Sequence, residues 1–171
     1  FAILLCGLTF IVWQWPQGKH VTFSGHVAVA RYKIVYYIVL FAAALPLLVL
    51  FFTKWFAPTF NLSVWFSVSL IISAVAQQAC SLIPETGGWK TRWHAILAGI
   101  SAFSLLPPLV LILMTSQIPS VGRVITFMSL LCMTSIVAMV ALRKGVGHYL
   151  TLQAAYYAAF FAPILATSYL L

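Results

Sequence analysis

Acidic residues are nearly absent from this chain of 171 residues, which has a single acid, Glu85, and no aspartate. Paired carboxylates are therefore excluded, and with them the two-carboxylate chemistry of glycoside hydrolysis and the carboxylate cages that hold hard metal ions. Charged residues of either sign make up only 6% of the sequence, whereas a soluble domain has about 25%. The composition therefore excludes a water-soluble fold.

Cysteine pairs and basic stripes are missing as well. The three cysteines, Cys6, Cys80 and Cys132, stand alone within apolar runs, which gives no zinc or thiol-redox motif and predicts buried structural thiols. The nine Lys and Arg residues stand singly or in pairs between those runs, and we therefore expect no nucleic-acid partner. Their spacing is typical of the topology signals of membrane proteins.

Apolar residues dominate the rest of the chain. They make up 64% of it, with a mean hydropathy of +1.09, and a membrane-crossing helix needs about 20 of them in succession. Six runs stand out, at 1–16, 34–53, 62–83, 95–115, 122–142 and 149–171. We predict an all-α, polytopic bundle of six transmembrane helices, forming one domain over residues 1–171 in a bacterial plasma membrane or its equivalent.

The distribution of positive charge predicts the orientation of this bundle. The first, third and fifth connections carry seven Lys and Arg residues, whereas the second and fourth carry only Lys54 and Arg123. The positive-inside rule then places the three odd-numbered connections in the cytoplasm and both chain ends outside. The seven residues are Lys19, Arg31, Lys33, Lys90, Arg92, Arg143 and Lys144.

Polar residues within the predicted spans are concentrated on the third one. Ser69, Ser73, Gln77 and Ser81 recur at a spacing of four, so they share one drifting helix face. Such a stripe either bonds helices together or lines a polar cavity.

Prolines lie inside the second, fourth and sixth predicted spans and predict kinks there. Proline frees carbonyl groups one turn back, and these need new partners in a membrane. Ser101 and Ser104 are the candidate partners in the fourth span. The kink-forming prolines are Pro46, Pro107, Pro108 and Pro163.

All four histidines and the one acid fall in the odd-numbered connections, and we therefore expect them on one side of the membrane. Three interpretations stay open: polar residues that meet lipid headgroups, a hydrolytic or headgroup-binding site that a metal assists, and a haem held between His94 and His148. His94 and Glu85 are the candidate catalytic residues. The candidate metal ligands are His20, His26, His94 and His148. We expect His94 to be buried, with Glu85, His26 or His148 in contact with it.

A resemblance to a known family lies in residues 80–103, Cys-Ser-Leu-Ile-Pro-Glu-Thr-Gly-Gly-Trp-Lys-Thr-Arg-Trp-His-Ala-Ile-Leu-Ala-Gly-Ile-Ser-Ala-Phe. This segment resembles the Pro-acid-Gly loop and His-led fourth helix of a bacterial six-helix membrane protein family of unknown function, which is distantly similar to the DRAM-like autophagy modulators. The family usually has an Ile-Ser-Asp-Leu-Gly-like segment in its first loop, and the corresponding residues here, 22–26, lack the acid. The resemblance implies the six-helix fold, a lipid-related setting and odd-numbered connections outside, opposite to the charge count.

These observations lead to three functional hypotheses. The first is a non-enzymatic integral membrane protein, either a small accessory subunit of other membrane proteins or a lipid-interacting protein. The second is a membrane enzyme that acts on a lipid or quinone headgroup through the His and Glu cluster, with metal or haem as a possible cofactor. The third is a small-solute transporter, based on the kinked helices and the polar stripe.

Overall fold

Helices account for the regular structure in the computed structural model, which describes residues 2–18, 21–142 and 147–169. Within those residues no strand is present, as the sequence predicted. The elements are α1 (Ala2–Gln14), α2 (Phe23–Val27), α3 (Arg31–Phe51), the π-helix η1 (Phe52–Phe56), α4 (Ala57–Thr59), α5 (Val64–Leu82), α6 (Gly88–Ser104), α7 (Leu106–Met114), α8 (Ser120–Ala141) and α9 (Tyr149–Tyr169).

Five continuous helical stretches in the described part of the chain are long and apolar enough to cross a membrane. They are Arg31–Thr59, Val64–Leu82, Gly88–Met114, Ser120–Ala141 and Tyr149–Tyr169. The remaining apolar helix, α1, has 13 residues, fewer than the roughly 20 that a bilayer crossing needs. The structure therefore supports five of the six predicted spans by length.

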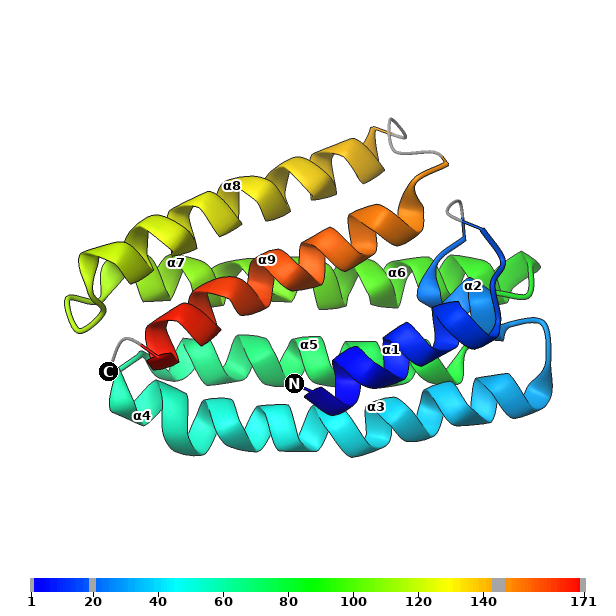
Figure 1. Cartoon of the computed structure of the whole chain (residues 1–171), viewed down its shortest axis with the longest axis horizontal. Coiled ribbons are helices and arrows are strands. Elements are labelled where there is room, and N and C mark those ends of the chain that lie inside the picture. Colours follow the sequence, from blue (N-terminus) through cyan, green and yellow to red (C-terminus); the bar gives the residue numbers. More distant parts are fainter. Residues whose placement is uncertain (1, 19–20, 143–146, 170–171) are drawn as a thin grey trace.

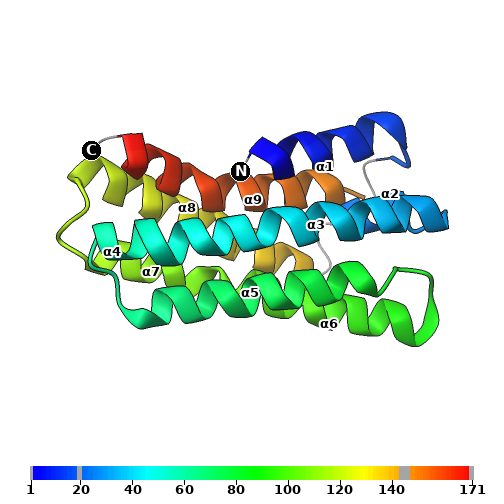
Figure 2. The same cartoon turned by 90° about the horizontal axis from the view of Figure 1, so that it is seen from below.

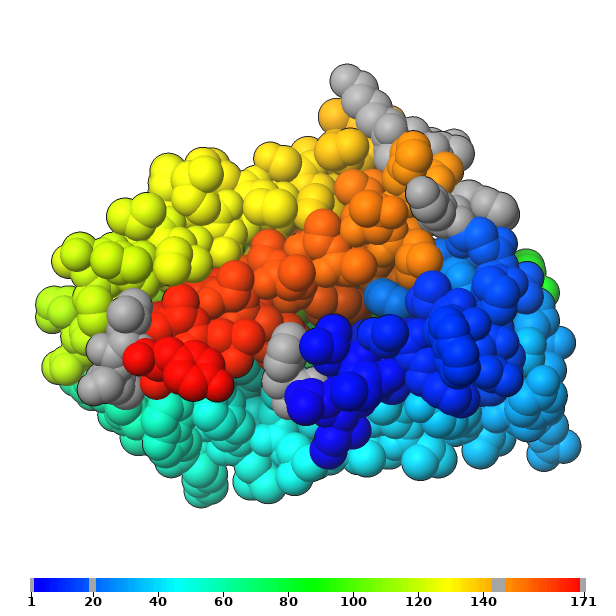
Figure 3. Space-filling model, viewed as in Figure 1, coloured from blue at the N-terminus to red at the C-terminus, as the bar shows by residue number. Residues whose placement is uncertain are grey.

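The long helices lie side by side along the longest axis of the molecule (Figures 1 and 2). Neighbours along the chain pack together: α3 against α5, α5 against α6, α7 against α8, and α8 against α9. On the face drawn in Figure 3, α9 lies between α8 and α1, with α3 along the lower edge. The short helix α2, the α5–α6 turn and the start of α9 gather at one end, which we call the α2 end (Figure 1).

Large apolar side chains cover the outside of the bundle as well as its interior. Val39, Phe103 and Met128 are 59%, 58% and 60% exposed, whereas exposed residues of a soluble helix are mostly polar.

Two apolar clusters fill the interior. One joins α1, α2 and α3 through Leu8, Val27 and other side chains, and the other joins the remaining long helices around an aromatic group that includes Phe52, Phe56, Phe66 and Phe160.

The second predicted span continues as a helix beyond its predicted end at residue 53. Lys54 and Pro58 predicted a loop, but η1 inserts one wide turn and α4 carries the helix on to Thr59. Phe52, Phe56 and Phe60 are all buried along this extension. Burial of these rings stabilises the extension and offsets the unfavourable free energy of placing Lys54 and Pro58 in this helix.

At Pro107 and Pro108, where a kink was predicted, the apolar stretch Gly88–Met114 has a one-residue break at Leu105, since α6 ends at Ser104 and α7 begins at Leu106. Neighbouring helices supply the partners for the carbonyls next to it: the Ser73 hydroxyl donates to the Ser101 carbonyl at 2.9 Å, and the Tyr156 hydroxyl donates to the Ala102 carbonyl at 2.5 Å. Ser101 and Ser104 of the same span were the predicted donors. The observed donors lie on other helices, so their bonds also link those helices to α6. Pro46 and Pro163 lie inside the continuous helices α3 and α9.

Helices α8 and α9 approach closely at Gly122. A Cβ atom at this position would lie 2.9 Å from Cγ2 of Ile118 and 3.1 Å from the hydroxyl oxygen of Thr167 on α9. Thr167 is fully buried and donates its hydroxyl to the Pro163 carbonyl at 2.6 Å. A small residue is therefore required where α8 crosses α9.

We predict that Gly122→Val lowers the free energy of unfolding of the purified protein by about 1–3 kcal/mol, because the added atoms overpack the α8–α9 contact. Gly99→Val is the matched control, since a Cβ at Gly99 meets no atom within 4 Å. Denaturant unfolding followed by circular dichroism measures both. Equal effects of the two substitutions would contradict the close packing at Gly122.

Candidate functional site

The α2 end holds a group of hydrogen-bonded polar side chains around the only acid of the chain. Thr22 caps the first turn of α2, where its hydroxyl oxygen accepts from the Gly25 amide at 3.1 Å. The same hydroxyl donates to Oε2 of Glu85 at 2.8 Å, and Ser24 Oγ lies 3.2 Å from that oxygen. Two hydroxyl groups of α2 therefore hold the carboxylate of the α5–α6 turn.

His94 completes the group from the second turn of α6, and it is 7% exposed. Its Nδ1 lies 2.7 Å from the carbonyl oxygen of Ile83, and because a carbonyl only accepts, Nδ1 carries a proton. In the neutral imidazole Nε2 is then an acceptor, and Ser24 Oγ lies 2.8 Å from it. In this tautomer the Ser24 hydroxyl is the group that can donate to Nε2 of His94.

The Ser24 hydroxyl has one proton for two acceptors, His94 and Glu85. Its oxygen lies 2.8 Å from Nε2 of His94 and 3.2 Å from Oε2 of Glu85, and Thr22 donates to the same Glu85 oxygen. A buried hydroxyl therefore connects the acid and the base of this site.

Cys80 packs against the same imidazole. Its sulfur lies 3.4 Å from Nδ1 and 3.3 Å from Nε2, almost the same distance from both nitrogens. A hydrogen bond to one ring nitrogen would place the sulfur clearly nearer to that nitrogen than to the other. The sulfur therefore makes a packing contact with the ring, and the hydrogen bonds of the ring to Ile83 and Ser24 are retained. Cys80 is buried as predicted, whereas Cys6 and Cys132 are exposed.

Helix α9 fixes the position of α2, and with it the position of Ser24. The Phe23 amide donates to Oε1 of Gln153 on α9 at 3.0 Å. The side chain of Phe23 is buried in the apolar cluster that joins α1, α2 and α3. A backbone bond and an apolar anchor thus hold the residue that precedes Ser24.

The expected neighbours of His94 are only partly present. Glu85 reaches it through Ser24, and within the described residues no hydrogen bond joins His94 to His26 or His148. His26 is buried and bonds through Nδ1 to the Thr22 carbonyl at 2.8 Å, and His148 is exposed. His20 lies outside the described residues. In the described part of the chain no three His, Cys, Asp or Glu residues stand close enough to hold a metal ion.

Sequence reasoning missed Ser24 and Thr22. The segment Thr-Phe-Ser-Gly-His at 22–26 carries a helix N-cap signal, a threonine followed by helical residues. That signal predicts a short helix and says nothing of what the helix touches. The contact with residues 83–94 is 61 to 70 residues away along the chain, so only the tertiary structure reveals it.

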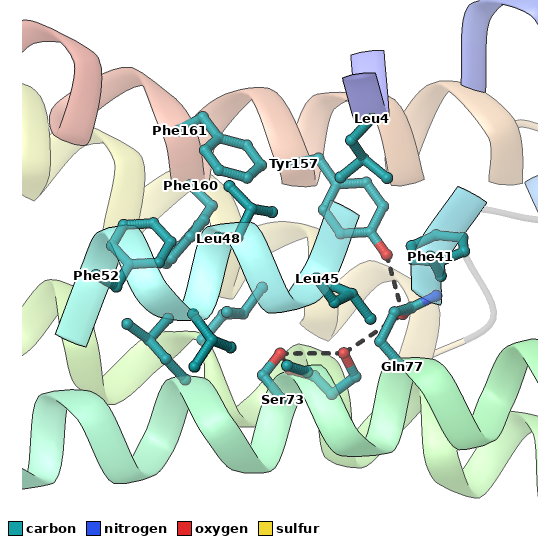
Figure 4. Close-up of a pocket in the computed structure, with 15 residues that line it drawn as sticks. Leu4, Phe41, Leu45, Leu48, Phe52, Ser73, Gln77, Tyr157, Phe160 and Phe161 are labelled. Carbon is teal, nitrogen blue, oxygen red and sulfur yellow. Dashed lines mark hydrogen bonds between the residues drawn. The ribbon is translucent and has the colours of Figure 1, made fainter. Parts of the chain in front are cut away.

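A second polar group lies midway along the bundle and contains part of the predicted stripe (Figure 4). Oε1 of Gln77 accepts from Ser101 of α6 at 3.4 Å and from Tyr157 of α9 at 3.2 Å. Ser73 lies 3.1 Å from the Ser101 hydroxyl, and these side chains border a cavity of about 50 Å³ whose other walls are apolar. Ser81 bonds within its own helix, to the carbonyl of Gln78 at 2.7 Å, and Ser69 is half-buried.

Comparisons with protein-family models, with curated proteins and with solved structures gave no match. The two polar groups are therefore the features of the structure that bear on function.

We predict that Gln77→Leu lowers the free energy of unfolding by about 1 kcal/mol, because Ser101 and Tyr157 lose an acceptor that links three helices. Gln78→Leu is the matched control, since the Gln78 amide donates within α5, to Ser81 at 3.1 Å. Thermal unfolding in detergent measures both. Unchanged stability in Gln77→Leu would show that these bonds do not hold the helices together.

Proposed function

We propose that this chain is an integral membrane protein of the bacterial plasma membrane that interacts with lipid headgroups at its α2 end, with α1 as a shorter sixth apolar segment. Five helices of membrane-crossing length and the apolar outer surface support the membrane setting. A role as an accessory subunit would fit the same bundle. The lipid role is preferred because exposed side chains of the α2 end have the chemistry that headgroups require.

Two exposed tryptophans and the basic side chains beside them at the start of α6 carry this proposal. Trp89 and Trp93 are 65% and 50% exposed, and the Lys90 ammonium lies 6.0 Å from the Trp89 ring. Across the same end of the bundle, the Lys33 ammonium lies 5.4 Å from the Trp15 ring. Indole rings favour the interface between lipid and water, where Lys and Arg side chains reach the phosphates.

The position of Glu85 strengthens the positive character of this end. Its carboxylate is engaged by the hydroxyls of Thr22 and Ser24, so the one negative side chain is directed into the site. Lys90 and Arg92 follow it within the next seven residues, and each basic residue near an anionic membrane surface contributes about 1 kcal/mol. The expected ligand is therefore a phospholipid with a net negative headgroup.

The first test measures headgroup binding. We expect the double substitution of Lys90 and Arg92 by Gln to weaken phosphatidylglycerol binding about 10- to 30-fold, from the loss of about 2 kcal/mol. Native mass spectrometry of the detergent-purified protein with short-chain phosphatidylglycerol measures this affinity, and phosphatidylcholine serves as the neutral reference.

The matched control replaces Lys54 and Arg123, which lie toward the opposite end of the bundle, by Gln. This variant has the same net charge as the first. A general charge effect would therefore weaken binding equally in both variants, whereas a local headgroup site would weaken it only in the variant at Lys90 and Arg92. Equal weakening in both variants would contradict a headgroup site at the α2 end.

The second test concerns orientation, with the odd-numbered connections proposed to face the cytoplasm. In a chain whose Cys6 and Cys132 are serines, Thr86→Cys in the α5–α6 turn should react with an impermeant thiol reagent only after the membrane is opened. Asn61→Cys, at another exposed position at the other end, should react in intact cells. The reverse pattern would favour the orientation that the family resemblance implies.

A further inference from the structure

The Ser24 hydroxyl, the His94 imidazole and the Ile83 carbonyl form a line of hydrogen bonds with the geometry of an activated nucleophile. Ser24 Oγ is 2.8 Å from Nε2, and Nδ1 is 2.7 Å from the Ile83 oxygen. A serine becomes a nucleophile when a base within about 2.6–3.2 Å accepts its proton and a third group orients that base. We propose that Ser24 is a nucleophile with His94 as its general base, and that the pair hydrolyses an acyl ester.

The substrate class follows from the surroundings of the pair and rests on the proposed lipid interaction. The site has no second acid for glycoside chemistry, and its described residues contain no metal-holding group. An ester carbonyl is an electrophile that a serine–histidine pair can attack without a second carboxylate and without a metal ion. At the headgroup level, the esters at hand are those that join fatty acids to glycerol, so the substrate is an acyl ester of a membrane lipid.

The chemistry balances with water as the only co-reactant. Ser24 Oγ attacks the ester carbonyl carbon while its proton passes to Nε2 of His94. When the tetrahedral intermediate collapses, the bond to the alcohol oxygen breaks, His94 returns the proton to that oxygen, and an acyl-Ser24 remains. Water then attacks the acyl group, with His94 accepting its proton and returning it to Ser24, and the free acid leaves.

Thr22 provides a donor for the negative oxygen of the tetrahedral intermediate. Its hydroxyl oxygen lies 2.9 Å from Ser24 Oγ and at present donates to Glu85. Hydroxyl groups can serve as oxyanion donors when they point at the developing charge. Once an ester takes the place of the Glu85 carboxylate next to Ser24, the Thr22 hydroxyl is free to turn to the substrate oxygen.

In the proposed reaction an ester approaches Ser24 past Glu85. Ser24 is 4% exposed, whereas Thr22 and Glu85 are half-buried and so lie nearer the surface of the bundle. The turn that carries Glu85 continues into Gly87 and Gly88, which have φ angles of 97° and 60°, a conformation that favours glycine. An ester therefore reaches the nucleophile by displacing one side chain, whose bonds to α2 are two hydroxyl contacts.

A fluorophosphonate probe tests the proposal without knowledge of the natural ester. The activated serine oxygen displaces fluoride from phosphorus, and the His94 base accepts the serine proton. We expect the purified wild-type protein in detergent to acquire one phosphonyl group, which peptide mapping by mass spectrometry assigns to Ser24. No labelling, or labelling at another serine, would overturn the proposal, and neither result depends on a variant that must fold.

Variants then separate nucleophile from base. Ser24→Ala should not react, and His94→Gln should react about 100-fold more slowly or less, because general base catalysis contributes 10²–10⁴-fold. Ser73→Ala is the matched control, since Ser73 is similarly buried, at 5% exposed, and bonds to hydroxyl and carbonyl groups with no imidazole. It should react like wild type, and equal rates in His94→Gln and Ser73→Ala would overturn the role of His94.

The two proposals fail separately in these experiments. Phosphatidylglycerol binding that persists without Ser24 labelling would overturn the nucleophile and leave the lipid interaction standing. Labelling of Ser24 without a preference for the anionic headgroup would support the nucleophile and overturn the headgroup site.

Discussion

Every polar group inside this bundle has to find its partner within the chain, and the rest of the structure depends on that constraint. In a low-dielectric interior an unpaired polar group costs several kcal/mol. Among the described residues no buried side-chain nitrogen or oxygen lacks a hydrogen-bond partner. Thr126 and Thr167 meet the constraint by bonding to carbonyls of their own helices, while Ser73 and Tyr156 do so across helices, where α6 is interrupted.

The same constraint explains the site at the α2 end. Glu85, His94 and Ser24 each need partners there, and each finds them in the others or in nearby backbone groups. Mutual satisfaction of this kind stabilises the packing of α2 against the α5–α6 hairpin. It also leaves a hydroxyl between a carboxylate and an imidazole. That arrangement could support a chemical reaction as well as hold the helices together.

Much of the fold was open to prediction because apolar length and helix formation are local properties. The apolar runs at 62–83, 122–142 and 149–171 correspond closely to α5, α8 and α9. The errors lie where tertiary contacts compete with local signals. Residues 54–59 read as a loop because of Lys54 and Pro58, yet burial of the aromatic rings of η1 extends the helix. Next to Pro107 and Pro108 the disruption predicted from the prolines falls at Leu105, and hydroxyl donors on α5 and α9, which no local signal predicted, bond to the neighbouring carbonyls.

For the site, the sequence by itself determined which groups are available: one acid, a histidine at the start of a predicted helix, and no paired carboxylates. It also predicted that His94 would be buried, and His94 is buried. Only the tertiary structure decided that Ser24 stands between His94 and Glu85, that His148 is exposed, and that Gln77 links three helices. The physical reason is that these choices depend on hydrogen bonds between residues 24 to 80 positions apart in the chain. The packing of whole helices decides which of these distant residues come together, and no local pattern of residues predicts that packing.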